Sequence, residues 1–228
     1  MKIKILCVCS ALAKGELTDT GHMIKEIMSA SEKYATTIGD EVKAELVFLA
    51  EDKIKFGCTH CGWCLEKQTA DAFCSIDDAL SKKIYPKIIE ADALILETPV
   101  YTGMRWLMAS FMSRLYALSE GGYYGYSSAF GDGSSGILKN KVLAAVSGGG
   151  VRYNDIETFM SSELFFALPF GMIPVTGPIN GRSGISGVPA AKAKEFAIVA
   201  KSIGMRVVEV SRLIKAGKTA LKNFPAYI

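Results

Sequence analysis

Short apolar runs alternate with amphipathic helical patterns along most of this chain of 228 residues. Five runs rich in β-branched residues are candidate strands: Ile3–Val8, Ala44–Leu49, Ala93–Leu96, Val142–Val146 and Met172–Val175. The helical patterns cover Thr18–Ile38, Asp77–Glu90, Arg105–Leu118, Asn154–Leu168 and Pro189–Lys215. Strands that alternate with helices pair in parallel through right-handed crossovers, which predicts a three-layer α/β sandwich. Five strands fit the order 2-1-3-4-5 better than the six-stranded dinucleotide-binding order.

Length and composition indicate an ordinary globular protein. The length suits one generous α/β domain, and without any internal repeat we expect a single domain over residues 1–228. Half of the residues are hydrophobic, so the core needs no disulfides, and intrinsic disorder is excluded. The formal net charge is +3 without a run of like charges, which gives little support to a nucleic-acid partner.

The first residues allow two interpretations. Lys2 and Lys4, followed by the apolar stretch Ile5–Ala13, resemble a signal peptide. A buried first strand is favoured, because the loop and helix that follow complete a nucleotide-binding unit. No apolar run approaches the ~20 residues that cross a bilayer. We therefore expect a cytoplasmic protein without membrane contact, in which thiols stay reduced.

Three loops should emerge at the carboxyl ends of successive strands, where parallel α/β sheets bind ligands. The first, residues 9–18, precedes a helix whose free N–H groups suit a phosphate, although the helix could simply be capped by Thr18. Ser10, Lys14 and Thr18 could supply hydroxyl and cationic donors to the phosphate, and Leu12 is a further candidate cofactor contact in this loop.

The other two loops are candidates for binding a flat ring. In the second, Pro99 is expected to end the third strand and fix the loop. Tyr101 offers a flat face to a ring, and the backbone amides beside it can reach the ring edge. The third loop offers Ser147, Gly148 and Gly149, whose glycines either admit a ring close to the backbone or serve a tight turn.

Four of the six cysteines lie in one segment with the spacing Cys58-x2-Cys61-x2-Cys64-x9-Cys74. Three cysteines at three-residue intervals with a fourth further on are typical of iron–sulfur cubane ligands. Tetrahedral zinc and redox-active thiols are the alternatives. Cys7 and Cys9 alternate on the first strand and are interpreted as small buried hydrophobes.

Two long segments interrupt the alternation: residues 50–76, which carry the cysteines, and residues 119–137, which are rich in Gly, Ser and Tyr. Loops this long in a compact domain are usually functional or disordered. The second is either a surface insertion or a lid or partner contact whose tyrosines cover a planar ligand.

The order of these features resembles the iron–sulfur flavoprotein branch of the NAD(P)H-dependent flavin reductase family. Three motifs carry the resemblance: the loop from Ser10 to Thr18, the cysteine run ending in Cys74-Ser-Ile-Asp-Asp, and Ala91-Asp92 followed by Thr98-Pro-Val-Tyr. The resemblance implies a flavodoxin-like fold with FMN on the three loops, a [4Fe-4S] cluster on the four clustered cysteines, and a homodimer or homotetramer. By position it implies that the candidate contacts of the ribityl chain and ring are Pro99, Val100, Tyr101, Thr102 and Gly103. The gap before Cys74 is longer than the family pattern, and residues 119–137 are extra.

The function expected on this basis is an FMN-dependent oxidoreductase that couples two-electron flavin chemistry to one-electron transfer through the cluster. We expect no side-chain acid or base, and the electron donor or acceptor would be ferredoxin or NAD(P)H. The alternatives are a flavin or quinone reductase without a cluster, a non-catalytic electron carrier, and a zinc-binding module without flavin.

Overall fold

The computed structural model describes residues 1–11, 19–52, 54–100, 104–125, 136–149, 166–175 and 194–220. Its parallel strands are β1 (Lys2–Cys9), β2 (Glu41–Phe48), β3 (Ala93–Val100), β4 (Val142–Gly149) and β5 (Ile173–Pro174). They form one five-stranded sheet in the order β2-β1-β3-β4-β5. This is the flavodoxin-like order, so the predicted fold is confirmed.

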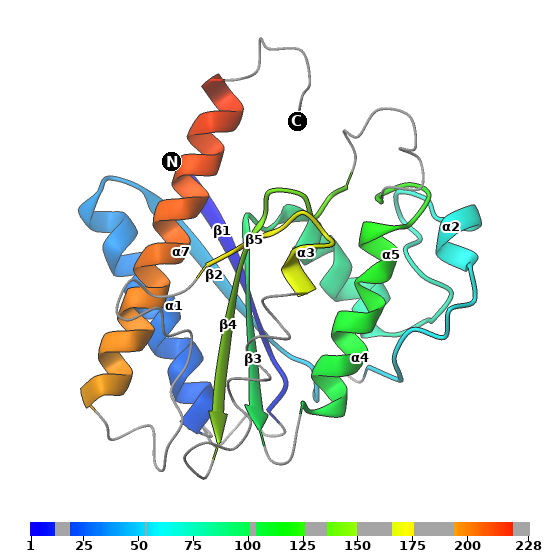
Figure 1. Cartoon of the computed structure of the whole chain (residues 1–228), viewed down its shortest axis with the longest axis horizontal. Coiled ribbons are helices and arrows are strands. Elements are labelled where there is room, and N and C mark those ends of the chain that lie inside the picture. The colour runs from blue at the N-terminus through cyan, green and yellow to red at the C-terminus, as the bar shows by residue number, and fades with distance from the viewer. Residues whose placement is uncertain are drawn as a thin grey trace.

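Helices cover both faces of the sheet (Figure 1). One face carries α1 (Asp19–Thr37) and α7 (Lys194–Ala220). The other carries the π-helical turn η1 (Leu80–Ile84) with α3 (Tyr85–Glu90), α4 (Trp106–Arg114) and α5 (Tyr116–Ser119). Because strand side chains alternate, Leu6 and Leu94 pack in the second of these cores, whereas Ile5 and Ile95 pack in the first. None of the described helices is long and apolar enough to span a membrane.

The helix expected over Asp77–Glu90 is divided into η1 and α3. Pro86 is the cause we identify, because proline has no N–H to donate to the carbonyl four residues back and its ring crowds that carbonyl. The wider π turn ends two residues before Pro86. Most of the helix expected over Asn154–Leu168 lies outside the described residues, which begin again at Phe166.

Two strands run further than expected, and this moves two groups of candidate residues from loops into the sheet. We expected Pro99 to end the third strand, but β3 continues through it to Val100. The prediction was wrong because β1 pairs with β3 only as far as Glu97, so no neighbour on that side needs the missing N–H of Pro99. Likewise, Ser147, Gly148 and Gly149 are the last residues of β4 and do not form a loop after it.

Candidate functional site

Hydroxyl groups from three strand ends meet at the carboxyl edge of the sheet. The hydroxyls of Ser10 and Thr98 lie 2.6 Å apart and share a hydrogen bond. The Ser147 hydroxyl donates to the carbonyl oxygen of Thr98 at 3.0 Å, and the Ser10 amide donates to the carbonyl of Glu97 at 3.0 Å. All three hydroxyl residues are fully buried. The structure thus brings together the starts of the three predicted loops.

The candidate ring contacts are neighbours across the sheet. Gly148 pairs with Pro99 and Gly149 with Val100 in the register of β3 and β4. Six further candidates lie outside the described residues: Leu12, Lys14, Thr18, Tyr101, Thr102 and Gly103. Thr98 was not among the candidates, although it precedes Pro99 directly, because hydroxyls that bond between strands leave no periodic pattern.

A buried thiol and a buried carboxyl group also face one another at this edge. The Sγ of Cys9 donates to Oε2 of Glu97 at 2.6 Å, and both side chains are fully buried. Burial, reinforced by the charge of Glu97, raises the pKa of the Cys9 thiol. Burial likewise raises the pKa of Cys7, whose side chain lies in the core between the sheet and α1. Both were predicted to be small buried residues, and this is confirmed.

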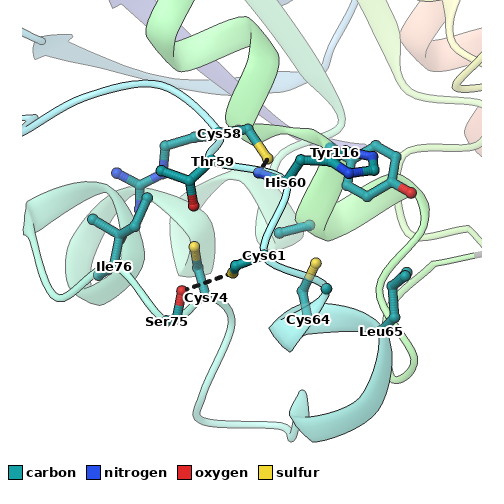
Figure 2. A pocket seen from close by; sticks show the side chains of 13 residues that line it. Cys58, Thr59, His60, Cys61, Cys64, Leu65, Cys74, Ser75, Ile76 and Tyr116 are labelled. Atoms are coloured by element: carbon teal, nitrogen blue, oxygen red, sulfur yellow. Dashed lines mark hydrogen bonds between the residues drawn. The ribbon is translucent and has the colours of Figure 1, made fainter.

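The four clustered cysteines line one pocket. Cys58, Cys61, Cys64 and Cys74 surround a small cavity of about 30 Å³ beside α5, and Figure 2 shows their side chains around this common space. All four are free thiols. Three come from the segment around the short helix α2 (Trp63–Lys67), and Cys74 returns from the far end of the nine-residue gap. We call this cavity the cysteine pocket.

Left-handed backbone turns bring the first three cysteines together. His60 and Gly62 have φ values of 55° and 74°, a conformation that favours glycine. The turn lets the amide of His60 donate to the Sγ of Cys58 at 3.4 Å, and the Cys58 amide in turn donates to the Ser113 hydroxyl of α4. The His60 side chain is exposed, and its ring centroid lies 5.8 Å from that of Tyr116.

The environments of the thiols differ. Cys61 Sγ shares a hydrogen bond of 3.2 Å with the Ser75 hydroxyl, and this bond, with backbone N–H groups, lowers the pKa of Cys61. Burial raises the pKa of Cys64, and the neighbouring cysteines, Cys74 first, raise it further. In the described part of the chain, no three Cys, His, Asp or Glu side chains form a site for a single metal ion.

An ion pair underlies the pocket. Arg114, at the end of α4, is 1% exposed and lines the cysteine pocket. It pairs with Asp78, and its Nη2 also donates to the Ser81 hydroxyl at 2.8 Å. Burial opposes the charge on both residues, but their mutual hydrogen bonds prevail, so the pKa of Asp78 falls and that of Arg114 rises. Neither residue was a sequence candidate, although Asp78 stands in the motif that follows Cys74 and Arg114 interrupts an apolar helix.

The start of the Gly/Ser/Tyr-rich insertion packs on the cysteine segment. Gln68, in the gap before Cys74, donates to the carbonyls of Phe73 and Ala117 and accepts from the amides of Tyr123 and Tyr124. The Tyr124 ring stacks on Phe73 with centroids 5.3 Å apart. The described part of the insertion therefore supports the cysteine segment, and residues 126–135 lie outside the description.

The glycines of the insertion allow this close packing. The amide of Gly122 donates to the carbonyl of Cys64 at 2.8 Å. A Cβ atom on Gly122 would lie 2.3 Å from the carbonyl oxygen of Leu65, and one on Gly121 would lie 2.2 Å from the Gln68 amide. Only glycine fits at either position without a shift of the backbone.

The donor sets of both sites fit the expected cofactors. Four reduced thiols around one space, approached by the Ser75 hydroxyl and backbone N–H groups, suit a thiolate-ligated cluster. At the carboxyl edge, buried hydroxyls and the paired glycine backbone suit a phosphorylated ring ligand.

Comparison with known proteins defines the family. No family model matches the chain. The structure is similar to that of RosB with bound 8-demethyl-8-formylriboflavin-5'-phosphate, with a TM-score of 0.66 at 14% identity, covering 99% of this chain and 89% of RosB. The chain therefore shares its fold with RosB.

Sequence relatives are more specific. The chain is 30% identical over 195 residues to an iron–sulfur flavoprotein of Archaeoglobus fulgidus, covering 78% of this chain and 87% of the relative. It is 28% identical over 198 residues to an iron–sulfur flavoprotein of Methanosarcina thermophila, covering 87% and 93%. The chain belongs to the iron–sulfur flavoprotein family.

Proposed function

We propose that this protein is an FMN-dependent oxidoreductase that couples two-electron flavin chemistry to one-electron transfer through a [4Fe-4S] cluster. The observation that carries the proposal is the convergence of Cys58, Cys61, Cys64 and Cys74 on one pocket. The names of the relatives agree with it, since they are iron–sulfur flavoproteins. Ferredoxin or NAD(P)H would exchange electrons with it, and a homodimer or homotetramer is the expected assembly.

The residues would divide between two sites. Ser10, Lys14 and Thr18 would hold the FMN phosphate, and Leu12 would contact the cofactor in the same loop. The ribityl chain and ring would be lined by Pro99, Val100, Tyr101, Thr102 and Gly103. The ring edge would lie against Ser147, Gly148 and Gly149. When bound, FMN supplies hydride chemistry and the cluster supplies single-electron transfer. The protein positions both groups and tunes their potentials.

The described residues suit these tasks. The buried hydrogen bonds among Ser10, Thr98 and Ser147 fix the strand ends from which the three loops leave. In the cysteine pocket, the hydroxyl of Ser75 and the amide of His60 bond to Cys61 and Cys58. Hydrogen bonds of this kind stabilise a thiolate and so prepare it to bind iron.

Anaerobic purification followed by an absorption spectrum and by iron, sulfide, zinc and FMN assays tests the proposal. We expect the protein to contain FMN, and we expect its iron and sulfide contents to equal one another. Cys61→Ser should lose iron and sulfide but keep FMN, because Cys61 lines the cysteine pocket and is not one of the proposed FMN contacts. The matched control is Cys7→Ala, a buried cysteine of β1 outside that pocket, which should keep all three.

The other outcomes separate the rival functions. Stoichiometric zinc without flavin would overturn the proposal. Unchanged iron and sulfide in Cys61→Ser would contradict the assignment of the cluster to these cysteines while the flavin assignment survived. FMN without iron and sulfide in the wild-type protein would indicate a flavin or quinone reductase. Reduction by ferredoxin without any turnover of NADH or NADPH would identify an electron carrier.

A further inference from the structure

Arg114 is held rigidly beside the cysteine pocket. It is the bulkiest of the fully buried side chains. Besides its pairing with Asp78, Nη2 contacts the carbonyl of Ile76 at 3.5 Å. Asp78 is itself fixed, because it accepts from the amides of Lys55 and Ser81, each at 3.2 Å. A guanidinium held by this many bonds cannot swing away from the pocket.

Only one residue of the ion pair lines the pocket: Arg114 does, whereas Asp78 does not. Lys, Arg, Asp and Glu are the residue types with a formal charge, and among the described residues that line the pocket Arg114 is the only one of these types. Its buried Nε has no hydrogen-bond partner among the described residues, and such an atom is costly unless something nearby compensates for it. The cationic member of the pair thus lies at the pocket, where the guanidinium interacts electrostatically with Cys74.

We propose that Arg114 is the charge-balancing residue of the cysteine pocket, where its fixed positive charge favours a negatively charged tetrathiolate occupant and its more reduced form. The inference rests on the proposed function for the identity of that occupant. It gives Asp78, in the motif after Cys74, the task of holding and partly offsetting the guanidinium charge.

Redox titration of the purified holoprotein tests this by the midpoint potential of the cluster. Arg114→Met should lower the potential, because removing a positive charge disfavours the reduced state. Asp78→Asn should raise it, because the guanidinium then lacks its counter-charge. Arg114→Lys should restore most of the wild-type value, and Lys67→Met, which removes an exposed charge from α2, should leave it unchanged.

A lone buried charge can prevent folding, so the double variant Asp78→Asn/Arg114→Met keeps the test decisive. It leaves no unpaired charge, and the single oxygen of Asn retains an acceptor for one of the two amides, that of Lys55 or that of Ser81. Its potential should also lie below the wild-type value. Shifts of Arg114→Met and Asp78→Asn in the same direction would overturn the proposal, as would an unchanged potential in the double variant.

A second measurement does not need the cluster. In the full chain stripped of metal, Cys74 is alkylated with anionic iodoacetate and with neutral iodoacetamide. Both reagents attack the same thiolate, so the ratio of their rates reports the local electrostatic potential. Arg114→Met should lower the ratio by about fivefold, whereas Lys67→Met should not.

An unchanged ratio of alkylation rates in Arg114→Met would overturn the inference even if the purified wild-type protein carries a cluster. If the wild-type protein carries no cluster, the proposed function fails, and the alkylation ratio still decides the role of Arg114.

Discussion

Gln68 uses both donors and both acceptor positions of one buried side-chain amide. Its bonds join the residue before Cys74, the helix α5 and the start of the insertion. Nothing in the sequence pattern marks Gln68, because its partners are backbone atoms that any residue type supplies. The longer gap before Cys74 thus contains the residue that fixes the position of that cysteine.

Gln68→Ala should destabilise the fold strongly. The substitution leaves two carbonyls and two amides without partners, and we expect a loss of about 2–4 kcal/mol in the free energy of unfolding. Urea denaturation followed by tryptophan fluorescence measures it. Lys67→Ala, at the exposed neighbouring position, should stay within about 0.5 kcal/mol of wild type. Equal midpoints for the two variants would show that the amide bonds contribute nothing.

At the level of elements, the contact between α1 and α7 depends on a glycine. A Cβ atom on Gly204 of α7 would lie 2.6 Å from the carbonyl oxygen of Ile27 and 2.9 Å from the Ser31 hydroxyl of α1. The Ser31 hydroxyl donates to the carbonyls of Ile27 and Gly204, at 2.8 Å and 3.3 Å. The two helices therefore approach backbone to backbone at this point.

Two glycine substitutions in α7 should have opposite effects. Gly204→Ala forces the helices apart and should cost about 1–3 kcal/mol, as overpacking does. Gly217→Ala meets nothing within 4 Å and should stabilise the helix by about 0.5–1 kcal/mol. Thermal and urea unfolding of both variants provide the measurement. A stabilised Gly204→Ala protein would contradict the close approach.

The strands and the long helices could be predicted from the sequence, whereas the short helix α2 could not. The strands and α1 follow from apolar periodicity, and their order follows from the rules of parallel sheets. The five-residue helix α2 has no periodic signal, and helices this short depend on tertiary bonds such as that from Gly122 to Cys64. The four cysteines were visible from their spacing, whereas Arg114 and Asp78 required the fold to bring them beneath the pocket.

Across the whole molecule, the edge of the sheet opposite the hydroxyl groups is held by buried and half-buried cations. The ammonium of Lys141, before β4, donates to the carbonyls of Ile89 and Ala91 at 2.9 Å and 2.5 Å. That of Lys215 in α7 pairs with Asp92 at 2.8 Å. Burial, with the nearby charge of Lys218, lowers the pKa of Lys141 from 10.5 to about 8.

That the whole chain forms a single domain stays a prediction.

The depressed pKa of Lys141 should appear as a pH dependence of stability. Between pH 8 and 10.5 the unfolded chain holds the proton that the folded chain has lost, so stability rises with pH in this window. Relative to Lys141→Met, the wild type should gain as much as about 3 kcal/mol over that window. Urea denaturation at a series of pH values gives both profiles. Parallel profiles would show that the folded-state pKa is not lowered.

The hydrogen bonds that join Gln68 and Cys64 to the start of the insertion also affect how the protein can change during evolution. A lineage that deleted residues 119–137 would leave the Gln68 side-chain oxygen and the Cys64 carbonyl without these donors. A lineage that lost Gln68 by shortening the gap before Cys74 would leave the amides of Tyr123 and Tyr124 without their acceptor. Each deletion alone is therefore selected against. We expect the longer gap and the insertion to be inherited together, so that homologues with a shorter gap before the fourth cysteine also lack the insertion.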